Sequence, residues 1–250
     1  MVKKTKASPV RRILINAQNR RLPRGVLILY EDRDLLVIDK PAGLLSIATG
    51  TEQEKTAYRI IAEYMRKKGE KRRPAAVHRL DRDTSGLMIF VKSAAVKKNF
   101  MDHWDELVRL RRYTALAEGD IRTSSGGKSE GIMDAPLGED RGGRVVVRSG
   151  GKSAVTRWTL LTIRGNDRDG LYSLLSLELE TGRRNQIRAH LSHLGHPVAG
   201  DKKYAARTNP LGRLALHAGT LAFFHPHDGR LMKFESPLPS LPLSPRRESG

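Results

Sequence analysis

Residues 78–87 read His78-Arg79-Leu80-Asp81-Arg82-Asp83-Thr84-Ser85-Gly86-Leu87, and they lead directly into the apolar run 87–91. The polar part consists of residue types that are common in turns, and the apolar run is typical of a buried strand. The stretch therefore predicts a loop anchored on a rigid strand, where catalytic groups are often found. A solvated turn is the alternative interpretation, and other parts of the chain must distinguish the two.

The charge of the chain indicates the kind of partner it binds. Its 250 residues include 46 Lys and Arg against 27 Asp and Glu, which gives a net charge of +19 and a pI near 10.5. A strongly basic chain favours a polyanion, most simply nucleic acid. The sequence has no long apolar span, signal peptide or lipidation signal. We therefore expect a soluble cytoplasmic protein that binds no membrane.

Several classes of site are excluded by composition and spacing. The chain has no cysteine, so disulfides, thiolate zinc sites and a Cys nucleophile are ruled out. His190, His193 and His196 recur, but no acid lies among them and they would not share one helix face, so no metal site is predicted. Two Gly-Gly-Lys-Ser segments, 126–129 and 150–153, lack the first glycine of a phosphate-binding loop. We expect neither a metal nor a nucleotide cofactor.

The order of apolar and polar segments predicts an α+β protein. Residues 1–25 carry eight basic residues and no acid, which predicts a flexible basic arm. Residues 26–239 are expected to form a single domain on a mixed, largely antiparallel β-sheet with flanking helices, and residues 240–250 a flexible tail. The expected strands cover 26–30, 35–41, 86–92, 111–117, 155–162, 171–179 and 214–224, and the expected helices cover 56–66, 93–107 and 183–194.

Residues 120–153 interrupt this pattern, because they are rich in Gly, Ser and charged residues. They predict an exposed excursion with a short hairpin around 144–147.

A second informative stretch covers residues 179–190, where a strand ends at Thr181-Gly182 and a helix follows. Free backbone N–H groups at a helix N-terminus, together with Arg183, Arg184 and Arg188, predict an anion site. The anion would be an RNA phosphate or the carboxylate of Asp81. An ordinary amphipathic helix with a solvated arginine face is the alternative.

The segments 78–81 and 84–87 together resemble the signature of RluA-type pseudouridine synthases. Further blocks similar to that family follow in the family's order: Leu36-Val37-Ile38-Asp39-Lys40-Pro41-Ala42-Gly43-Leu44, Arg112-Tyr113-Thr114-Ala115-Leu116, Thr181-Gly182-Arg183 with Gln186-Ile187-Arg188, Gly195-His196-Pro197-Val198-Ala199-Gly200-Asp201, Leu216-His217-Ala218 and Phe234-Glu235-Ser236-Pro237-Leu238-Pro239. The resemblance extends from about residue 26 to residue 239, so residues 26–239 would be the catalytic domain.

The resemblance implies a catalytic aspartate at Asp81, a stacking tyrosine at Tyr113 and an ion-pairing arginine at Arg188. It also implies a pseudouridine synthase fold without cofactor or metal. One departure is Asn185, where many members of the family have His before the Gln. This substitution is mild and puts little in doubt.

The chemistry of uridine isomerisation is consistent with these residues. The reaction breaks the N1–C1′ bond, rotates the uracil and joins C5 to C1′, and cleavage of a glycosidic bond calls for a carboxylate. Asp81 would be the nucleophile or the base that removes the C2′ proton. The target uridine must be flipped out of folded RNA, and Tyr113 could stack on it. The side chains expected to contact RNA are His78, Arg79, Arg82, Thr84, Arg183, Arg184, Gln186, Arg72 and Arg73.

The expected substrate is ribosomal or transfer RNA, and a monomer is the default expectation. Two other functions compete with the synthase. One is a non-catalytic RNA-binding or ribosome-associated factor, which would not require Asp81. The other is a metal-dependent nuclease that uses Asp81 and Asp83, and activity in the presence of a chelator would exclude it.

Overall fold

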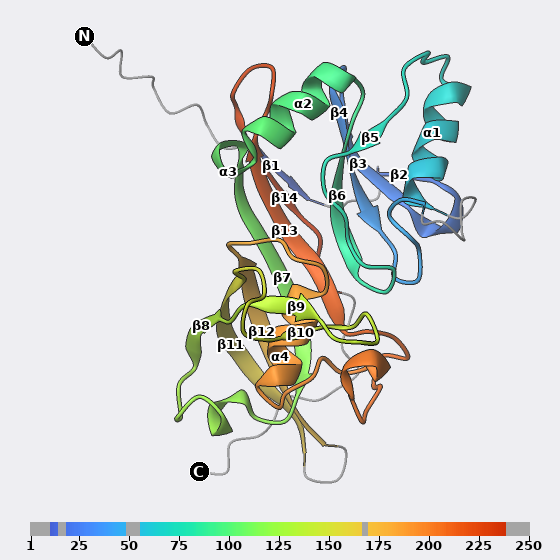
Figure 1. The fold of residues 1–250 in the computed structure, drawn as a ribbon. Coiled ribbons are helices and arrows are strands. Elements are labelled where there is room, and N and C mark those ends of the chain that lie inside the picture. Colours follow the sequence, from blue (N-terminus) through green and yellow to red (C-terminus); the bar gives the residue numbers. More distant parts are fainter. Residues whose placement is uncertain (1–10, 15–18, 49–55, 167–169, 239–250) are drawn as a thin grey trace. The chain divides into compact units, whose positions relative to one another are not determined.

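A computed structural model describes residues 11–14, 19–48, 56–166 and 170–238 (Figure 1). The chain divides into two compact units. Unit 1 consists of Met1–Leu80, Gly86–Leu110 and Thr220–Pro237, and unit 2 consists of Asp81–Ser85, Arg111–Gly219 and Leu238–Gly250. The secondary structure is α+β, as expected.

The sheet of unit 1 is mixed. The strands β2 (Arg20–Arg21), β3 (Leu27–Glu31), β4 (Leu35–Lys40) and β6 (Ser85–Val91) are antiparallel neighbours in that order, and β5 (Ala75–Ala76) also pairs with β6. The strand β1 (Arg11–Leu14) pairs in parallel with β14 (Leu231–Glu235). Asp32 closes the β3–β4 hairpin, because its Oδ1 accepts hydrogen bonds from the backbone N–H groups of Asp34 and Leu35, both at 2.8 Å.

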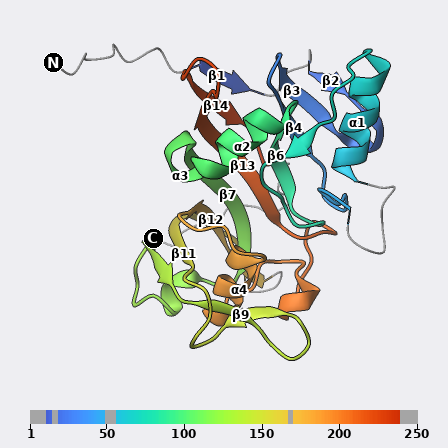
Figure 2. The ribbon, with the colours of Figure 1, turned by 45° about the horizontal axis from the view of Figure 1, so that its top comes forward.

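The helices of unit 1 begin at capped positions. Helix α1 (Ala57–Lys67) follows Thr56, and helix α2 (Ala94–Asp102) follows Ser93; each cap's hydroxyl accepts a hydrogen bond from a first-turn N–H. The predicted helix 93–107 is two helices, because His103 has a non-helical backbone and separates α2 from α3 (Trp104–Leu107). Figure 2 shows α1 alongside the end of the sheet that contains β3 and β4.

The core of unit 1 consists of apolar side chains from its sheet and from α2. The rings of Phe223 and Phe234 stack with centroids 5.6 Å apart, and Phe100 of α2 meets Phe223 edge to face. All seven residues of β6 are buried, so the strand that follows the loop is a rigid anchor, as the sequence predicts.

The sheet of unit 2 is antiparallel, and a helix packs on it. Its strands are β7 (Val108–Glu118), β12 (Gly170–Leu179), β11 (Val155–Asn166) and β8 (Glu130–Asp134), in that order, with β7 contributing from Arg111 onward. Helix α4 (Gln186–His193) packs on this sheet through Ile187 and Leu191, and His190 hydrogen-bonds Thr156 of β11. The first residues of β13 (Leu216–Phe224) also belong to this unit.

The excursion 120–153 contains a short hairpin, as predicted. The strands β9 (Leu137–Glu139) and β10 (Val145–Val147) pair antiparallel, and a short 3-10 turn precedes them at Ile121–Thr123. A similar turn outside the excursion lies at Lys202–Tyr204. A small apolar cluster that includes Leu137, Val145 and Ala189 packs the hairpin against α4.

The predicted helix 183–194 begins three residues later than expected. Asn185 adopts a left-handed conformation with φ of 53°, which is incompatible with a continuous helix, so α4 starts at Gln186. Its end agrees with the prediction, because Leu194 is the C-cap and Gly195 follows with φ of 83°.

The segment predicted as a flexible basic arm is partly ordered. Residues 11–14 and 20–21 form β1 and β2, because the backbone of this segment completes both edges of the unit 1 sheet and Ile13 packs on its core. Residues 1–10, and the tail from 239 onward, lie outside the described residues. The domain limits 26–239 stay a prediction. No helix in the described part of the chain has both the length and the apolar character to cross a bilayer.

Candidate active site

An aspartate and an arginine from distant parts of the sequence meet in unit 2. Asp81 lies just before β6, and its Oδ2 is 3.2 Å from Nη1 of Arg188 on α4. The guanidinium is almost buried, with 9% of the side chain exposed, whereas 20% of the Asp81 side chain is exposed. The carboxylate is therefore fixed by a charged hydrogen bond and still accessible from outside.

Arg188 is held in place by a second carboxylate. Its Nε and Nη2 donate to the two oxygens of Asp201, at 2.6 and 2.8 Å, and Asp201 is only 1% exposed. The guanidinium carbon also lies 5.1 Å from the ring centre of Tyr204. A two-pronged carboxylate contact and an aromatic face fix both the position and the plane of a guanidinium. Nη1 is thereby directed to Asp81.

The charge of Arg188 is secured by its neighbours. Burial alone would lower its pKa, but the carboxylates of Asp201 and Asp81 outweigh this effect and raise the pKa overall. The side chain is thus a permanent cation at the centre of the site.

Tyr113 lies on β7, opposite Leu177 of β12, and its side chain is half-buried. Burial raises the pKa of the Tyr113 phenol to about 12; the positive charge of Arg111 opposes this rise, and the negative charge of Asp81 adds to it. The influence of Asp81 means that the two side chains are electrostatic neighbours. The structure thus places Asp81 and Arg188 in direct contact, and the charge of Asp81 acts on the Tyr113 phenol; the catalytic roles of all three stay predictions.

The loop that carries Asp81 is fixed on both sides. In unit 1, Ser46 Oγ donates to the carbonyl of Leu80 at 2.6 Å and accepts from its N–H at 3.0 Å. In unit 2, Ser85 Oγ is 2.9 Å from Nδ1 of the buried His217. Thr84 between them is 2% exposed, so it supports the loop from inside, although we expected it to contact RNA.

Gln186 is also a supporting residue rather than an exposed one. It is 2% exposed, and its Oε1 accepts from the Thr181 hydroxyl at 2.8 Å and from the Arg183 N–H at 2.9 Å. Its Nε2 donates to the carbonyl of Val155 at 3.0 Å. The Gln186 amide thus links the end of β12 to the start of α4 and orients the helix toward Asp81. Its hydrogen-bonding groups are engaged with other groups of the protein.

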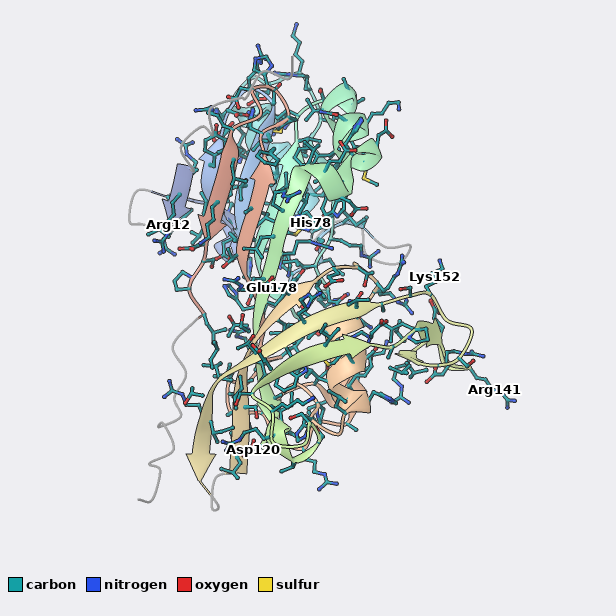
Figure 3. The ribbon with its side chains drawn as sticks, turned by 90° about the vertical axis from the view of Figure 1, so that its left-hand side faces the viewer. Arg12, His78, Asp120, Arg141, Lys152 and Glu178 are labelled. Atoms are coloured by element: carbon teal, nitrogen blue, oxygen red, sulfur yellow. The ribbon has the colours of Figure 1, made fainter. Side chains whose placement is uncertain are left out.

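Arg183 and Arg184 are exposed, and both connect α4 to the excursion. Arg183 Nε donates to the Ser153 carbonyl at 2.9 Å, and Arg184 Nη2 donates to the Gly143 carbonyl at 2.8 Å. Figure 3 shows Arg141 and Lys152 projecting from this excursion. Arg184 also pairs with Glu139 of the excursion, with its Nη2 3.1 Å from Oε1.

The remaining predicted side chains fall into two groups. Arg82 and Asp83 are exposed in the loop itself. In unit 1, Arg72, Arg73 and Arg79 are exposed. His78 is instead half-buried: its Nε2 accepts a hydrogen bond from the Ile89 N–H at 3.1 Å, and its ring lies 5.8 Å from that of Trp104.

Two residues of the site were not identified from the sequence, namely Asp201 and Tyr204. Asp201 was visible as the last residue of the block 195–201, but nothing in its spacing indicated a contact with Arg188. Tyr204 lies in a turn, where an aromatic side chain gives no periodic signal. Two of the three histidines have separate partners: His190 bonds Thr156 and His196 bonds the Glu118 carbonyl.

A pocket of about 390 Å³ lies elsewhere in unit 2, between β8, Trp158 and the end of α4. It contains none of the predicted catalytic residues. Neither Asp81 nor Arg188 lines this pocket; that pair combines a fixed carboxylate with a permanent cation.

Comparison with known proteins places the chain among isomerases that act on RNA. The family model described as RNA pseudouridylate synthase matches residues 34–193. YhcT of Bacillus subtilis (strain 168), an uncharacterized RNA pseudouridine synthase, is 38% identical over 215 residues, which are 85% of this chain and 68% of that protein. The chain therefore belongs to the RluA-type RNA pseudouridylate synthase family, as its sequence blocks indicated.

Two further comparisons agree. Ribosomal large subunit pseudouridine synthase D of Nitrosomonas europaea is 35% identical over 85% of this chain and 62% of that protein. The solved structure of human RNA pseudouridylate synthase domain containing 1 matches with a TM-score of 0.71 and 25% identity, over 89% of both chains. Family membership favours the enzyme over the non-catalytic RNA-binding alternative.

Proposed function

We propose that this enzyme converts specific uridines of ribosomal RNA to pseudouridine, with Asp81 as the catalytic carboxylate. The observation that carries the proposal is the 3.2 Å pair between Asp81 and Arg188, whose guanidinium is itself held by Asp201. A fixed guanidinium keeps the carboxylate in one orientation before the substrate arrives. Preorganised charge of this kind is a large contribution to enzyme catalysis.

The reaction is an isomerisation, so the substrate and the product contain the same atoms. The N1–C1′ bond breaks, the detached uracil turns, C5 bonds to C1′, and the proton on C5 is finally replaced by one on N1. Asp81 acts at the ribose of the flipped-out uridine, either on C1′ as a nucleophile or on C2′–H as a base. Arg188 holds the carboxylate in its reactive orientation throughout.

Tyr113 serves as the platform for the flipped base. A pKa of about 12 keeps its phenol protonated near neutral pH, so it is not a general base there. Its ring can stack on uracil while the base turns. Stacking of a base on an aromatic side chain contributes roughly 1–3 kcal/mol.

We expect Tyr113→Phe to keep most of the activity and Tyr113→Leu to lower kcat/KM by about five- to 150-fold, the equivalent of about 1–3 kcal/mol of stacking. The alkaline limb of the pH–rate profile should be the same in wild type and Tyr113→Phe up to about pH 11, because a raised phenol pKa delays ionisation. Steady-state kinetics across pH tests both statements. A large loss in Tyr113→Phe would instead assign a chemical role to the hydroxyl.

The RNA is bound largely through its phosphates. The exposed side chains proposed for this role are Arg72, Arg73, Arg79, Arg82, Arg183 and Arg184. His78, Thr84 and Gln186 are proposed to act indirectly, by shaping the loop and the start of α4. Phosphate contacts add affinity that depends on salt and does not depend on the RNA sequence.

We also propose that the enzyme is cytoplasmic and monomeric.

Ribosomal RNA is the proposed substrate because similar proteins include ribosomal large subunit pseudouridine synthases; transfer RNA is the other candidate. The test is to map pseudouridine in total RNA from cells that lack the protein and from the same cells expressing wild type again. Sites that disappear and return identify the substrate. An unchanged map would contradict the proposal, and sites confined to transfer RNA would correct the substrate.

A further inference from the structure

Arg213, just before β13, is a half-buried arginine without a carboxylate partner in the described part of the chain. Its Nη1 donates to the Leu214 carbonyl at 3.0 Å and makes a longer hydrogen bond of 3.4 Å to Ser85 Oγ. Arg122, another half-buried arginine of unit 2, has an acidic partner in Asp120. Arg213 lacks such a counter-charge in the described part of the chain.

The missing counter-charge has an energetic consequence. Burial lowers the pKa of Arg213, and no nearby acid offsets this effect. Charged groups that are removed from water are normally paired, because desolvation is unfavourable unless an opposite charge compensates for it. An anion that comes from outside the chain would provide this compensation.

The neighbours of Arg213 connect it to the catalytic loop. Ser85, which its guanidinium contacts, is four residues after Asp81, and Ser85 is itself held by the buried His217. All of these residues belong to unit 2. The guanidinium is thus positioned relative to the loop that carries the proposed catalytic carboxylate.

We infer that Arg213 binds a backbone phosphate of the RNA next to the target uridine, and that this contact sets which nucleotide reaches Asp81. The inference rests on the proposed function, because it takes the Asp81 loop as the reaction centre. A phosphate is the anion that accompanies every nucleotide, and a guanidinium matches its oxygens with paired N–H donors. Ser85 and His217 are positioning residues for this contact.

The test is a binding cycle that does not depend on turnover. The probe is a fluorescent RNA hairpin that contains the mapped uridine, prepared with a single uncharged methylphosphonate at each position around that uridine. If mapping identifies no uridine, the probe is a fluorescent oligouridylate, and the measured quantity is the slope of log Kd against log salt. Each RNA is titrated with wild type, Arg213→Gln and Arg213→Lys.

We expect Arg213→Gln to weaken binding of the hairpin by about ten- to a hundredfold, as for loss of one charged hydrogen-bonded contact. One methylphosphonate position should weaken wild type to a similar degree and have no further effect on Arg213→Gln. The salt slope should fall by about 0.7–0.9, the contribution of one phosphate contact. Arg213→Lys should lie between wild type and Arg213→Gln.

Arg122→Gln is the matched control, since its guanidinium is already neutralised by Asp120; it should change Kd and the salt slope much less. Equal effects of every methylphosphonate on wild type and Arg213→Gln, or an unchanged salt slope, would overturn the inference. If Arg213→Gln does not fold, the methylphosphonate series is titrated with wild type and Arg213→Lys instead. Wild-type binding that no methylphosphonate position weakens would contradict the contact directly. Failure of the proposed function would appear separately, as an unchanged pseudouridine map.

Discussion

Purified Asp81→Asn is expected to form no measurable pseudouridine while it binds RNA with close to wild-type affinity. The amide has the same shape as the carboxylate and can still accept a hydrogen bond from Arg188, so the site should keep its geometry. It has no negative charge and is neither a nucleophile nor a base. Loss of the central catalytic group typically lowers kcat by about 10⁴-fold or more. Single-turnover assays with excess enzyme measure the chemical step, and RNA titrations measure binding.

Asp83→Asn is the matched control for this prediction. Asp83 is in the same loop and has the same side chain, but it is exposed, and it should retain activity. Loss of activity in Asp83→Asn with retention in Asp81→Asn would reverse the assignment. Loss of activity on addition of a chelator would instead favour metal-dependent chemistry at these two acids.

The second large effect is expected on stability. Arg188→Met should destabilise unit 2 by about 3–5 kcal/mol, because it leaves the Asp201 carboxylate buried without a cation. Asp201→Leu should have a similar effect, since it leaves Arg188 with Asp81 as its one carboxylate partner. The double variant Arg188→Met/Asp201→Leu should recover much of the stability and none of the activity. Recovery of stability without activity would separate the structural role of the pair from its role at Asp81.

Urea unfolding is the measurement for this prediction. The chain has two tryptophans, of which Trp158 is in unit 2 and Trp104 is in unit 1. In a Trp104→Phe background, Trp158 fluorescence therefore reports on unit 2. The exposed pair Arg112–Glu178 is the control, and Arg112→Met should change stability by about 1 kcal/mol or less. Unchanged midpoints in both single variants would show that the buried pair contributes little to folding.

The residues proposed as catalytic could be picked out because their signals are local. Asp81 and Tyr113 lie in short contiguous blocks that resemble the family, and Ser93 precedes its helix as an N-cap should. Asp201 could not be found in this way, since it meets Arg188 across a turn-rich segment without any periodic pattern. A local sequence pattern identifies candidate residues, but it does not identify the acidic side chain that pairs with a buried arginine.

Burial explains the other differences. Thr84 and Gln186 were both expected to contact RNA, yet both are buried. A polar residue that completes an internal hydrogen-bond network has the same sequence signature as one that faces a ligand. The helix start was also misplaced, because a left-handed Asn185 cannot be recognised among the residues that surround it.

The central cluster has a consequence for how a nucleotide enters. Asp81, Arg188 and Asp201 comprise two carboxylates and one guanidinium, which leaves one negative charge within a chain whose net charge is +19. The positive field of the whole chain attracts the RNA from a distance, whereas this local charge repels a phosphate at close range. The uncharged uridine does not experience that repulsion. Under the proposed function, we expect the uncharged nucleoside to reach Asp81 while its phosphates stay outside this cluster.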